Sequence, residues 1–434
     1  MEQTNSRPLL AWPSGGLWRE ADFLKLWSAQ GISALGSRIT RTALPILAVL
    51  TIGATVEQVA ILSALALAPG VIVGLAMGGR VDRRAKRPML IAADLFRAAL
   101  LLTVPLTAWL GWLSMGQLYA VAALTGAATT LFEIADKAYL PALIGRSRLI
   151  EGNAKLEATD AIAEITGPGL GGLLIQAITA PVAIAFDALS FIISAVLLGT
   201  IRRAEVPATS DTIEEGPTLI HDLRVGLRAC VLHPLVRPVF LVEAVSALLN
   251  GVFATLYTVF ALKTLGLSAG TLGLVISVGG IGALSGALLA ARFSDWLGMG
   301  RALILFMAVS RLAGLLIPLA RGPKWLAVSC LVGHQLVGDA LLMGYYVLAV
   351  SLRQTVLPQD TLGRANATFH VSAGLLLPIG ALLAGSIAAA TDVRTALWIS
   401  ALGGLANPVI LQLSALRHLK EMPATGHEPR SEVG

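Results

Sequence analysis

The sequence predicts an all-α membrane protein with twelve transmembrane helices arranged as two pseudo-symmetric six-helix bundles. Three observations support this fold class: an apolar composition, twelve apolar blocks of spanning length, and an internal repeat. Of the 434 residues, 56% are hydrophobic and 13% are charged, and the mean hydropathy is +0.77. Because a soluble domain carries about 25% charged residues, a water-soluble fold of this size could not bury so much apolar surface. Lipid must therefore be the solvent for most of the chain.

Transmembrane helices need about 20 mostly apolar residues each, and polar turns separate blocks of this kind along the chain. Six blocks come before a long polar stretch, at 22–51, 57–78, 88–110, 115–136, 153–176 and 181–201. Six more follow it, at 238–262, 269–291, 301–320, 324–351, 366–390 and 394–416. The predicted organisation is a first bundle over 1–201, a cytoplasmic linker over 202–235, a second bundle over 236–416 and a cytoplasmic tail over 417–434.

The two halves of the chain align with each other, without gaps, at an offset of 213 residues. This offset superimposes residues of unusual type, namely Asp82 on Asp295, Asn153-Ala154 on Asn366-Ala367, Gly167 on Gly380 and Gly172 on Gly385. Agreement at one offset over this whole stretch indicates a duplicated six-helix unit, which is common in transporters.

The distribution of Lys and Arg predicts the orientation in the membrane. Basic residues gather in the loops on the side of the N-terminus, whereas the loops on the other side carry only Lys263, Arg321, Lys324 and Arg394. Because cytoplasmic loops are enriched in Lys and Arg, we expect both termini in the cytoplasm and the protein in the inner membrane of a bacterial cell. The N-terminal stretch MEQTNSRPLLAWPSGG has no apolar core, so we expect no cleaved signal peptide.

The linker contains a pattern of its own. Leu219, Leu223, Leu227 and Val231 recur every four residues between Pro217 and Val231. This spacing predicts an amphipathic helix that lies along the membrane or beneath one bundle. We interpret it as a structural connection between the two halves.

Several classes of function are excluded by what the sequence lacks. The formal charge of +6 does not indicate nucleic-acid binding, because the basic residues sit in short turns between apolar blocks. The two cysteines, Cys230 and Cys330, are too few for a disulfide framework or a metal cluster. The chain contains no Gly-Lys pair, and therefore no phosphate-binding loop of the Gly-x-x-x-x-Gly-Lys type. We expect no enzyme activity, no cofactor and no metal site, and an ion gradient as the energy source.

The loop after the second block reads Gly78-Gly79-Arg80-Val81-Asp82-Arg83-Arg84-Ala85-Lys86-Arg87. It resembles the loop motif Gly-x-x-x-Asp-Arg-x-Gly-Arg-Lys/Arg of the major facilitator family. The match is carried by Gly78, Asp82, Arg83, Lys86 and Arg87, and the sequence departs from the motif at Ala85. The resemblance covers essentially the whole chain and implies the major facilitator fold. It also implies that this loop, together with the degenerate second copy at Asp295, acts as a conformational latch between the halves.

The fifth block carries Gly167-Pro168-Gly169-Leu170-Gly171-Gly172. This stretch is similar to the Gly-Pro-x-x-Gly-Gly core typical of major facilitator antiporters, with matches at Gly167, Pro168, Gly171 and Gly172. Ordinary packing of small residues would explain the glycines but not the proline, which bends a helix. The motif therefore favours export over import.

Further segments, such as LPALIGRSRLIEGNA and FDALSFIISAVLL, resemble the branch that contains enterobactin-type siderophore exporters and macrolide efflux pumps. The resemblance implies a bulky, amphipathic substrate. One departure bears on the mechanism: the arginine-bearing motif of the fourth span is absent, since no arginine occurs from Met115 to Phe132. A proton relay that uses this arginine is therefore not expected.

Ionisable residues inside a membrane span are costly, so we treat them as candidate functional residues. The fifth block presents Glu157, Asp160 and Glu164 on one helical stripe. Asp160 and Glu164 are candidates for proton coupling, since burial beside like charges favours proton uptake. The alternative is a structural role in ion pairs with Arg38 and Arg41 of the first block, an Arg38–Glu164 pair in particular.

The family resemblance implies that spans one, four, seven and ten line the substrate cavity. Candidate cavity or coupling residues in these spans, besides Arg38 and Arg41, are Glu133, Glu243, Asn250, Gln335 and Asp339. Gln335 and Asp339 share a helix face at a separation of four residues, and His334 is their neighbour.

We therefore expect a secondary active transporter that exports a small amphipathic molecule, such as a drug or a siderophore, by proton antiport and alternating access. Its partners would be the substrate, protons and the lipid bilayer, without nucleic acid, and it would act as a monomer. An importer or a lipid transporter of the same fold is the first alternative. A membrane sensor or partner protein that transports nothing is the alternative of another class.

Overall fold

The computed structural model describes residues 16–81, 85–203 and 219–421 of the chain, apart from the side chains of 78–81 and 219–220. The first half holds a 3₁₀ turn η1 (Gly16–Arg19) and six long helices: α1 (Ala21–Leu47) with the π-helical extension η2 (Ala48–Ile52), α2 (Val56–Val81), α3 (Lys86–Leu110), α4 (Met115–Ile144), α5 (Leu149–Ala177) and α6 (Ala180–Gly199). A short turn, η3 (Arg146–Arg148), connects α4 to α5.

The second half begins after helix α7 (Leu219–Leu232). Its spanning elements are α8 (Val236–Val259) with η4 (Phe260–Thr264), α9 (Ala269–Leu297), α10 (Met299–Gly314) with α11 (Leu316–Leu319), α12 (Lys324–Gly333) with η5 (His334–Gly338) and α13 (Asp339–Val356), α14 (Gln359–Ala390), and α15 (Val393–Gly404) with α16 (Ala406–Gln412). A last turn, η6 (Ala415–His418), follows. The fold is thus the predicted all-α membrane fold with six spanning segments on each side of α7.

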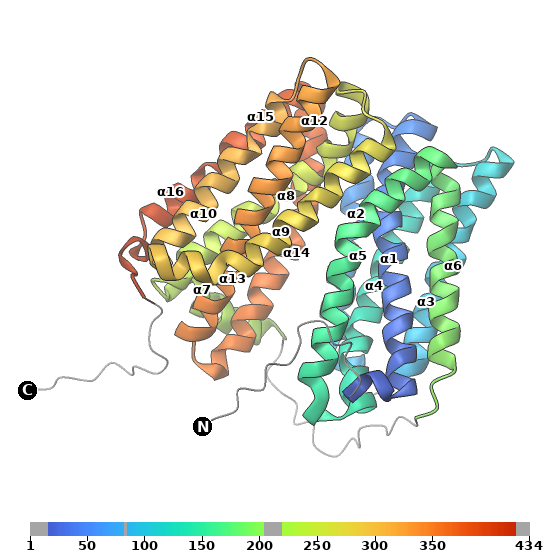
Figure 1. Ribbon diagram of the computed structural model, residues 1–434, viewed down its shortest axis with the longest axis horizontal. Helices are drawn as coiled ribbons and strands as arrows, with labels where there is room; N and C mark the ends of the chain where they lie inside the picture. The colour runs from blue at the N-terminus through green and yellow to red at the C-terminus, as the bar shows by residue number, and fades with distance from the viewer. Residues whose placement is uncertain (1–15, 82–84, 204–218, 422–434) are drawn as a thin grey trace, which may run out of the picture.

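Eleven of the described helical segments are long and apolar enough to cross a membrane. The twelfth, α5, has the necessary length of 29 residues, but its carboxylates and glycines lower its hydropathy. Figure 1 shows α5 running the full height of the first bundle beside α1, and α5 contacts both α1 and α9. A helix whose polar residues face other helices rather than lipid can cross a membrane without being apolar overall.

The chain crosses between two sides of the molecule. We call the side at which α6 ends and α7 lies the linker side. The opposite side carries the turns at Gly53, Gly111, Gly266 and Gly322, four glycines with positive φ. Glycine suits these positions because the left-handed conformation has a steric cost for other residues.

The two bundles meet toward the opposite side and separate toward the linker side (Figure 1). α5 packs on α9, and α2 packs on α14. The buried apolar residues follow the same division. One cluster joins both halves and includes Leu47 and Leu256, while two further clusters, one in each half, lie toward the linker side. The structure is therefore closed on the opposite side.

The predicted repeat is visible in the contacts between helices. A side chain at Gly167 would collide with the Cβ of Arg38, and the residues 213 positions later, Gly380 and Gly251, are also in contact. Likewise Gly172 of α5 packs on Gly273 of α9, and the equivalent pair is Gly385 of α14 on Ala60 of α2. The duplicated unit thus forms equivalent contacts both within each half and between the halves.

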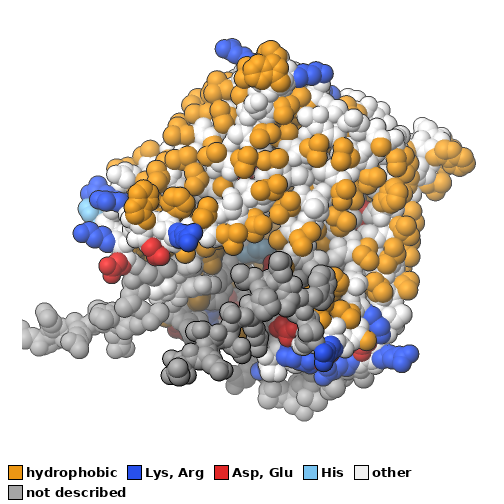
Figure 2. Space-filling model, viewed as in Figure 1, with side chains coloured by type: hydrophobic (Ala, Val, Ile, Leu, Met, Phe, Trp, Pro, Cys, Tyr) orange, Lys and Arg blue, Asp and Glu red, His pale blue; other side chains and the backbone are white. Residues whose placement is uncertain are grey.

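The outer surface is apolar along the height of the molecule. Figure 2 shows hydrophobic side chains over most of this face, with Lys and Arg gathered mainly along its lower rim. The exposed tryptophans lie near helix ends, namely Trp109, Trp112 and Trp325 toward the opposite side and Trp296 toward the linker side. Tryptophan in such places is typical of the interface between lipid and water.

Helix α7 packs beneath the second half, on α14 and α8. The face that it buries holds Gly226 and Cys230, whereas Leu227 and Val231 of the leucine stripe are 46% and 41% exposed. The reason is a close approach of backbones, because a side chain at Gly226 would collide with the Arg364 carbonyl. An ion pair of 2.8 Å between Asp222 and Arg364 fixes this contact.

Candidate functional site: the cavity between the two halves

A cavity of about 440 Å³ lies between the two halves, and residues of both line it. The first half contributes Arg38, Arg41, Thr42 and Pro45 from α1 and Glu164 and Pro168 from α5. The second half contributes mainly Asn250, Phe253, Tyr257, Thr258, Ile276, Ser310, Arg311, Ile317, His334, Gln335, Asp339 and Leu342. This volume lies in the range of sites that bind drug-sized molecules, which are mostly apolar with a few placed polar groups.

The first-half wall of the cavity holds Arg38, Arg41 and Glu164, which form a charged cluster with Asp160, a residue that is not among the described lining residues. The Arg38 Nη2 atom lies 2.9 Å from both carboxylate oxygens of Asp160, and its Nη1 atom lies 2.7 Å from Glu164. Arg41 lies 3.7 Å from the other oxygen of Glu164. The structure thus brings four predicted residues together, and two positive charges balance two negative charges.

Two glycines of α5 allow this cluster to form, because they let α5 lie close to α1. Gly167 lies against the Cβ of Arg38, and Gly171 lies against the backbone of Ile39, so α1 and α5 approach each other closely. The Arg38 side chain is only 15% exposed, whereas Asp160 and Glu164 are 50% and 48% exposed. The carboxylates therefore remain accessible to water and protons, while the cation between them is held in place.

In the second half, the polar groups of the cavity come from a break in helix geometry. Helices α12 and α13 are joined by the π-helical segment η5. Residues five apart lie about 140° apart around an α-helix, but a π-helix aligns residues i and i+5. The segment therefore brings His334 and Asp339 to the same face, beside Gln335, and all three line the cavity.

The glycine opposite this segment makes room for its side chains. At Gly279 of α9, a Cβ atom would lie 2.5 Å from an Asp339 carboxylate oxygen and 2.9 Å from the Gln335 amide nitrogen. Gln335 donates a hydrogen bond of 3.3 Å to the Val275 carbonyl. Asp339 has no hydrogen bond or ion pair within the part of the chain that the structure describes.

Arg311 of α10 is a cavity residue that we did not predict. It is buried, with 8% exposure, and donates a hydrogen bond of 2.6 Å to the Ser246 hydroxyl. The same hydroxyl accepts a bond of 2.8 Å from Asn407. The rule that ionisable residues in spans are functional candidates applies to Arg311 as well, so the sequence did contain the signal.

The antiporter-type motif of α5 lies at the contact between the halves. The Gly169 N–H donates a hydrogen bond of 2.8 Å to Ser277 of α9, and Gly172 packs on the backbone of Gly273. The Pro168 carbonyl faces Gly273, and its ring lines the cavity. Small residues allow helix backbones to approach in this way inside a membrane. The motif thus joins the charged cluster to the contact that closes the opposite side.

Comparison with known proteins places this architecture in a family. The model of the Major Facilitator Superfamily matches residues 26–352, which is most of the chain. The chain belongs to the Major Facilitator Superfamily. Members of this family are carriers rather than enzymes, and the predicted family and fold class are confirmed.

Relatives of this major facilitator protein include named efflux proteins. Macrolide efflux protein A of Streptococcus pyogenes is 24% identical over 206 residues, which is 47% of this chain and 50% of that protein. The matched region thus spans about half the length of that relative. Multidrug efflux pump Tap of Mycolicibacterium fortuitum is 26% identical over 371 residues, covering 83% of this chain and 87% of that protein. The predicted resemblance to the branch with macrolide efflux pumps is confirmed.

Solved structures show the same fold. The nucleoside transporter NupG superimposes with a TM-score of 0.72 at 12% identity, over 90% of this chain and 98% of that chain. A bacterial homologue of the iron transporter ferroportin in its inward-facing state superimposes with a TM-score of 0.68 at 16% identity, over 92% of this chain and 98% of that chain.

The loop motif of this major facilitator protein is described only in part. Asp82 and Arg83 lie outside the described residues, as does the neighbouring Arg84, whereas Gly78 belongs to α2 and Lys86 is buried at the start of α3. Asp295, the proposed second copy, is exposed on α9. The motif's last residue, Arg87, donates a hydrogen bond of 2.8 Å to the Leu198 carbonyl and another to the Gly199 carbonyl.

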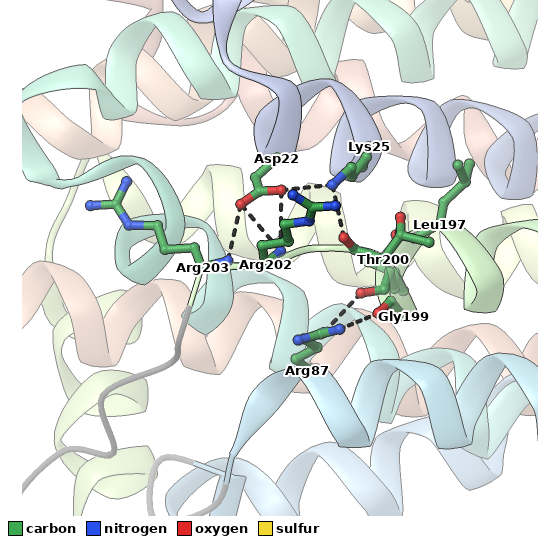
Figure 3. Close-up of polar contacts among 9 residues, drawn as sticks. Asp22, Lys25, Arg87, Leu197, Gly199, Thr200, Arg202 and Arg203 are labelled. Atoms are coloured by element: carbon green, nitrogen blue, oxygen red, sulfur yellow. Dashed lines mark hydrogen bonds and ion pairs between the residues drawn. The ribbon is translucent and has the colours of Figure 1, made fainter.

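Figure 3 shows that this end of α6 is held from two sides. Lys25 of α1 donates a bond of 2.8 Å to the Thr200 carbonyl and pairs with Asp22 at 2.9 Å. Asp22 in turn accepts bonds from the backbone N–H groups of Arg202 and Arg203. The last carbonyls of a helix lack intrahelical partners, and Arg87 and Lys25 satisfy them. Arg87 therefore stabilises the first half itself on the linker side.

The remaining predicted site residues lie in different places. Asn250 lines the cavity, but neither Glu133 nor Glu243 is among the described residues that do. Glu133 is exposed on α4. Glu243 lies 3.8 Å from Arg353, and the Arg353 guanidinium lies over the Phe369 ring at 4.0 Å. This buried pair connects α8, α13 and α14 within the second half, which is a structural arrangement.

Proposed function

We propose that the protein exports a small amphipathic molecule in exchange for protons, by alternating access of the cavity between its halves. The observation that carries this proposal is the Arg38–Asp160–Glu164 cluster, of which Arg38 and Glu164 line a cavity that both halves share. Supporting it are the antiporter-type motif beside the cluster and the relatives that are named efflux proteins.

The cluster suits proton coupling because it is neutral only while both carboxylates are ionised. Protonation of Glu164 removes the partner of Arg41 and one of the two partners of Arg38. The cluster then carries an excess positive charge within the membrane, where uncompensated charge is costly. A proton and a cationic group of the substrate therefore compete for the cavity, which is the requirement for antiport.

The proposed orientation follows the positive-inside rule. The linker side would face the bacterial cytoplasm, with both termini there, and the protein would act as a monomer in the inner membrane. With this orientation the closed opposite side faces outward, so the structure corresponds to an inward-facing carrier. Substrate would enter the cavity from the cytoplasm or the inner leaflet and leave after the halves rock.

The test is transport in inverted membrane vesicles with an imposed pH gradient, acidic inside. Addition of macrolides, siderophores and amphipathic amines should dissipate the gradient in a compound-dependent way. Glu164→Gln should abolish this coupling, whereas Glu157→Gln, a matched change at an exposed position of the same helix, should preserve it. Coupled flux that survives in Glu164→Gln would refute the assigned role of this carboxylate.

The same vesicles separate the alternatives. Uptake driven into right-side-out vesicles, without export from inverted ones, would identify an importer or a lipid transporter. The absence of compound-dependent flux in both preparations would identify a sensor or partner protein. The likeness to NupG supports the fold alone and does not favour import.

A further inference from the structure

The two walls of the cavity differ in how their charges are compensated. In the first half, Arg38, Arg41, Asp160 and Glu164 form ion pairs with one another. In the second half, Arg311 and Asp339 both line the cavity, yet neither has an ion pair of 4 Å or less within residues 16–81, 85–203 and 219–421. The second-half wall thus presents one uncompensated cation and one uncompensated anion.

The repeat emphasises this difference. The residues 213 positions before Arg311 and Asp339 are Ala98 and Gly126, and those 213 positions after Arg38 and Glu164 are Gly251 and Leu377. None of these four charged cavity residues therefore has a charged residue at the equivalent position of the other half. An unpaired charge within a membrane is costly. The repeated architecture does not account for Arg311 and Asp339, so their presence in the cavity wall indicates a function.

Arg311 is built into the wall as a fixed donor. Its Nη2 atom donates to the Ser246 hydroxyl, which Asn407 also holds, and its Nε atom contacts the Met307 sulfur at 3.3 Å. These contacts use two of the five N–H groups of the guanidinium. Its other N–H groups have no hydrogen bond to any residue that the structure describes, so they can bind a ligand with an anionic oxygen, for which arginine is the preferred partner.

Asp339 is likewise held in position without a cation. The π-helical segment η5 directs it to the cavity, and the backbone of Gly279 supports its carboxylate. Its neighbours His334 and Gln335 offer further polar atoms, since the His334 Nδ1 atom is buried without a hydrogen-bond partner. A carboxylate in this setting is a suitable partner for a protonated amine.

We infer that the second-half wall binds the two charged ends of a zwitterionic amphiphile, with Arg311 on its carboxylate or equivalent anionic oxygen and Asp339 on its protonated amine. The apolar body of the ligand would contact Phe253 and Ile317, which line the same cavity. The inference rests on the proposed function in that it takes this cavity as the substrate site.

The experiment measures binding, so that it does not depend on transport. Purified full-length protein in detergent is titrated with a fluorescent zwitterion, a fluoroquinolone with a piperazine ammonium and a carboxylate. The same titration is made with its methyl ester, which lacks the anion, and with its N-acetyl derivative, which lacks the cation. We expect each neutralised compound to bind about tenfold more weakly than the zwitterion, because a charge-assisted hydrogen bond is lost.

Variants assign each end of the ligand. Arg311→Gln should weaken zwitterion binding and abolish the preference over the methyl ester, while retaining the preference over the N-acetyl compound. Asp339→Asn should also weaken zwitterion binding, but it should abolish the preference over the N-acetyl compound and retain the preference over the methyl ester. Arg301→Gln and Asp360→Asn, at exposed positions of α10 and α14, should leave both preferences unchanged.

Equal affinity for all three compounds would overturn the inference, as would single variants that lower thermal stability while the double variant restores it. The latter result would show that Arg311 and Asp339 compensate each other across the empty cavity. Failure of the proposed export has a different signature: the zwitterion would bind with the expected preferences, but no pH-coupled flux of any compound would occur in inverted vesicles.

Discussion

Arg38 of α1 and Glu164 of α5 lie 2.7 Å apart in the cavity wall, one turn from the glycine that lets their helices touch. Arg38 also bonds both oxygens of Asp160, so a single buried cation holds two accessible carboxylates. The ion pairs join α1 to α5, which is a structural role. The exposure of the two carboxylates also suits them to proton exchange. The two roles that the sequence left as alternatives are therefore compatible in one cluster.

Arg38→Ala should destabilise the protein by roughly 1–3 kcal/mol, because it leaves two neighbouring carboxylates without their cation. The figure is below that of a fully buried pair, since Asp160 and Glu164 are about half exposed and partly screened by water. Thermal unfolding in detergent measures the effect. Arg41→Ala is the control, since Arg41 is 66% exposed and 3.7 Å from its partner, and it should change stability by less than about 0.5 kcal/mol. Equal losses in the two variants would contradict this assignment.

Gly172→Ala should weaken the closure of the opposite side. The added Cβ would collide with the Ala269 carbonyl and lie 2.9 Å from the Gly273 Cα, and overpacking of this kind costs about 1–3 kcal/mol. The balance between cavity orientations should shift by roughly 10- to 100-fold. With the natural cysteines replaced by serine and a cysteine introduced at Thr42, labelling by an impermeant maleimide from the opposite side should accelerate. Gly363→Ala, where the structure leaves open space, should not change the labelling rate.

Gly279→Ala should lower the affinity for a zwitterionic ligand several-fold. Its Cβ would lie 2.5 Å from the Asp339 carboxylate and displace that side chain from the cavity wall. The fluorescence titration described above measures the change. Gly363→Ala is the matched control, since Gly363 is not among the described residues that line the cavity and has nothing within 4 Å of its Cβ position. An unchanged affinity in Gly279→Ala would contradict this prediction, because it would show that zwitterion binding does not depend on the position of the Asp339 carboxylate.

Asp392, at the start of α15 outside the membrane spans, should confer pH-dependent stability. The hydrogen bond from the Thr395 hydroxyl, followed by those from the backbone N–H groups of Thr395 and Arg394, lowers the pKa of this carboxyl below its ordinary value. Because the folded pKa is lowered, the stabilisation is present above the unfolded pKa and is lost as the pH falls through the folded pKa. Asp392→Ala should therefore lower the free energy of unfolding by about 1 kcal/mol at pH 7, the usual contribution of an N-cap residue. The loss should be smaller near pH 3. Thermal unfolding of both proteins at the two pH values checks this difference.

The spans and the repeat were predictable because they depend on composition and on a fixed offset. The apolar blocks of the sequence coincide with the spanning segments of both halves, and among the described helices α5 is the one whose hydropathy alone does not identify it as a span. The pairing of Arg38 with Glu164 was also foreseeable, since buried charges of opposite sign in one bundle seek each other.

Other features were beyond the sequence for physical reasons. The π-helical segment η5 has no signature in residue type, so α-helical spacing predicted that Gln335 and Asp339 share a face but could not place His334, five positions before Asp339, in the same cavity wall. The face by which α7 packs on the second half also depends on the close approach of Gly226 to the α14 backbone, which the leucine spacing does not reveal. Arg311 was overlooked although its charge was visible, and what distinguishes it is that it has no carboxylate partner among the described residues.

The π-helical segment η5 also has a consequence for how such a carrier changes over generations. A π turn accommodates one residue more than the α-helix that contains it. Deletion of a single residue between His334 and Gly338 would restore a continuous α-helix, in which His334 and Asp339 would be four positions apart and still lie within about 40° of each other. The helices α12 and α13 on either side would keep their orientation, and Asp339 would keep its place in the cavity wall. One codon could thus be gained or lost at this place while the binding groups of the carrier are retained.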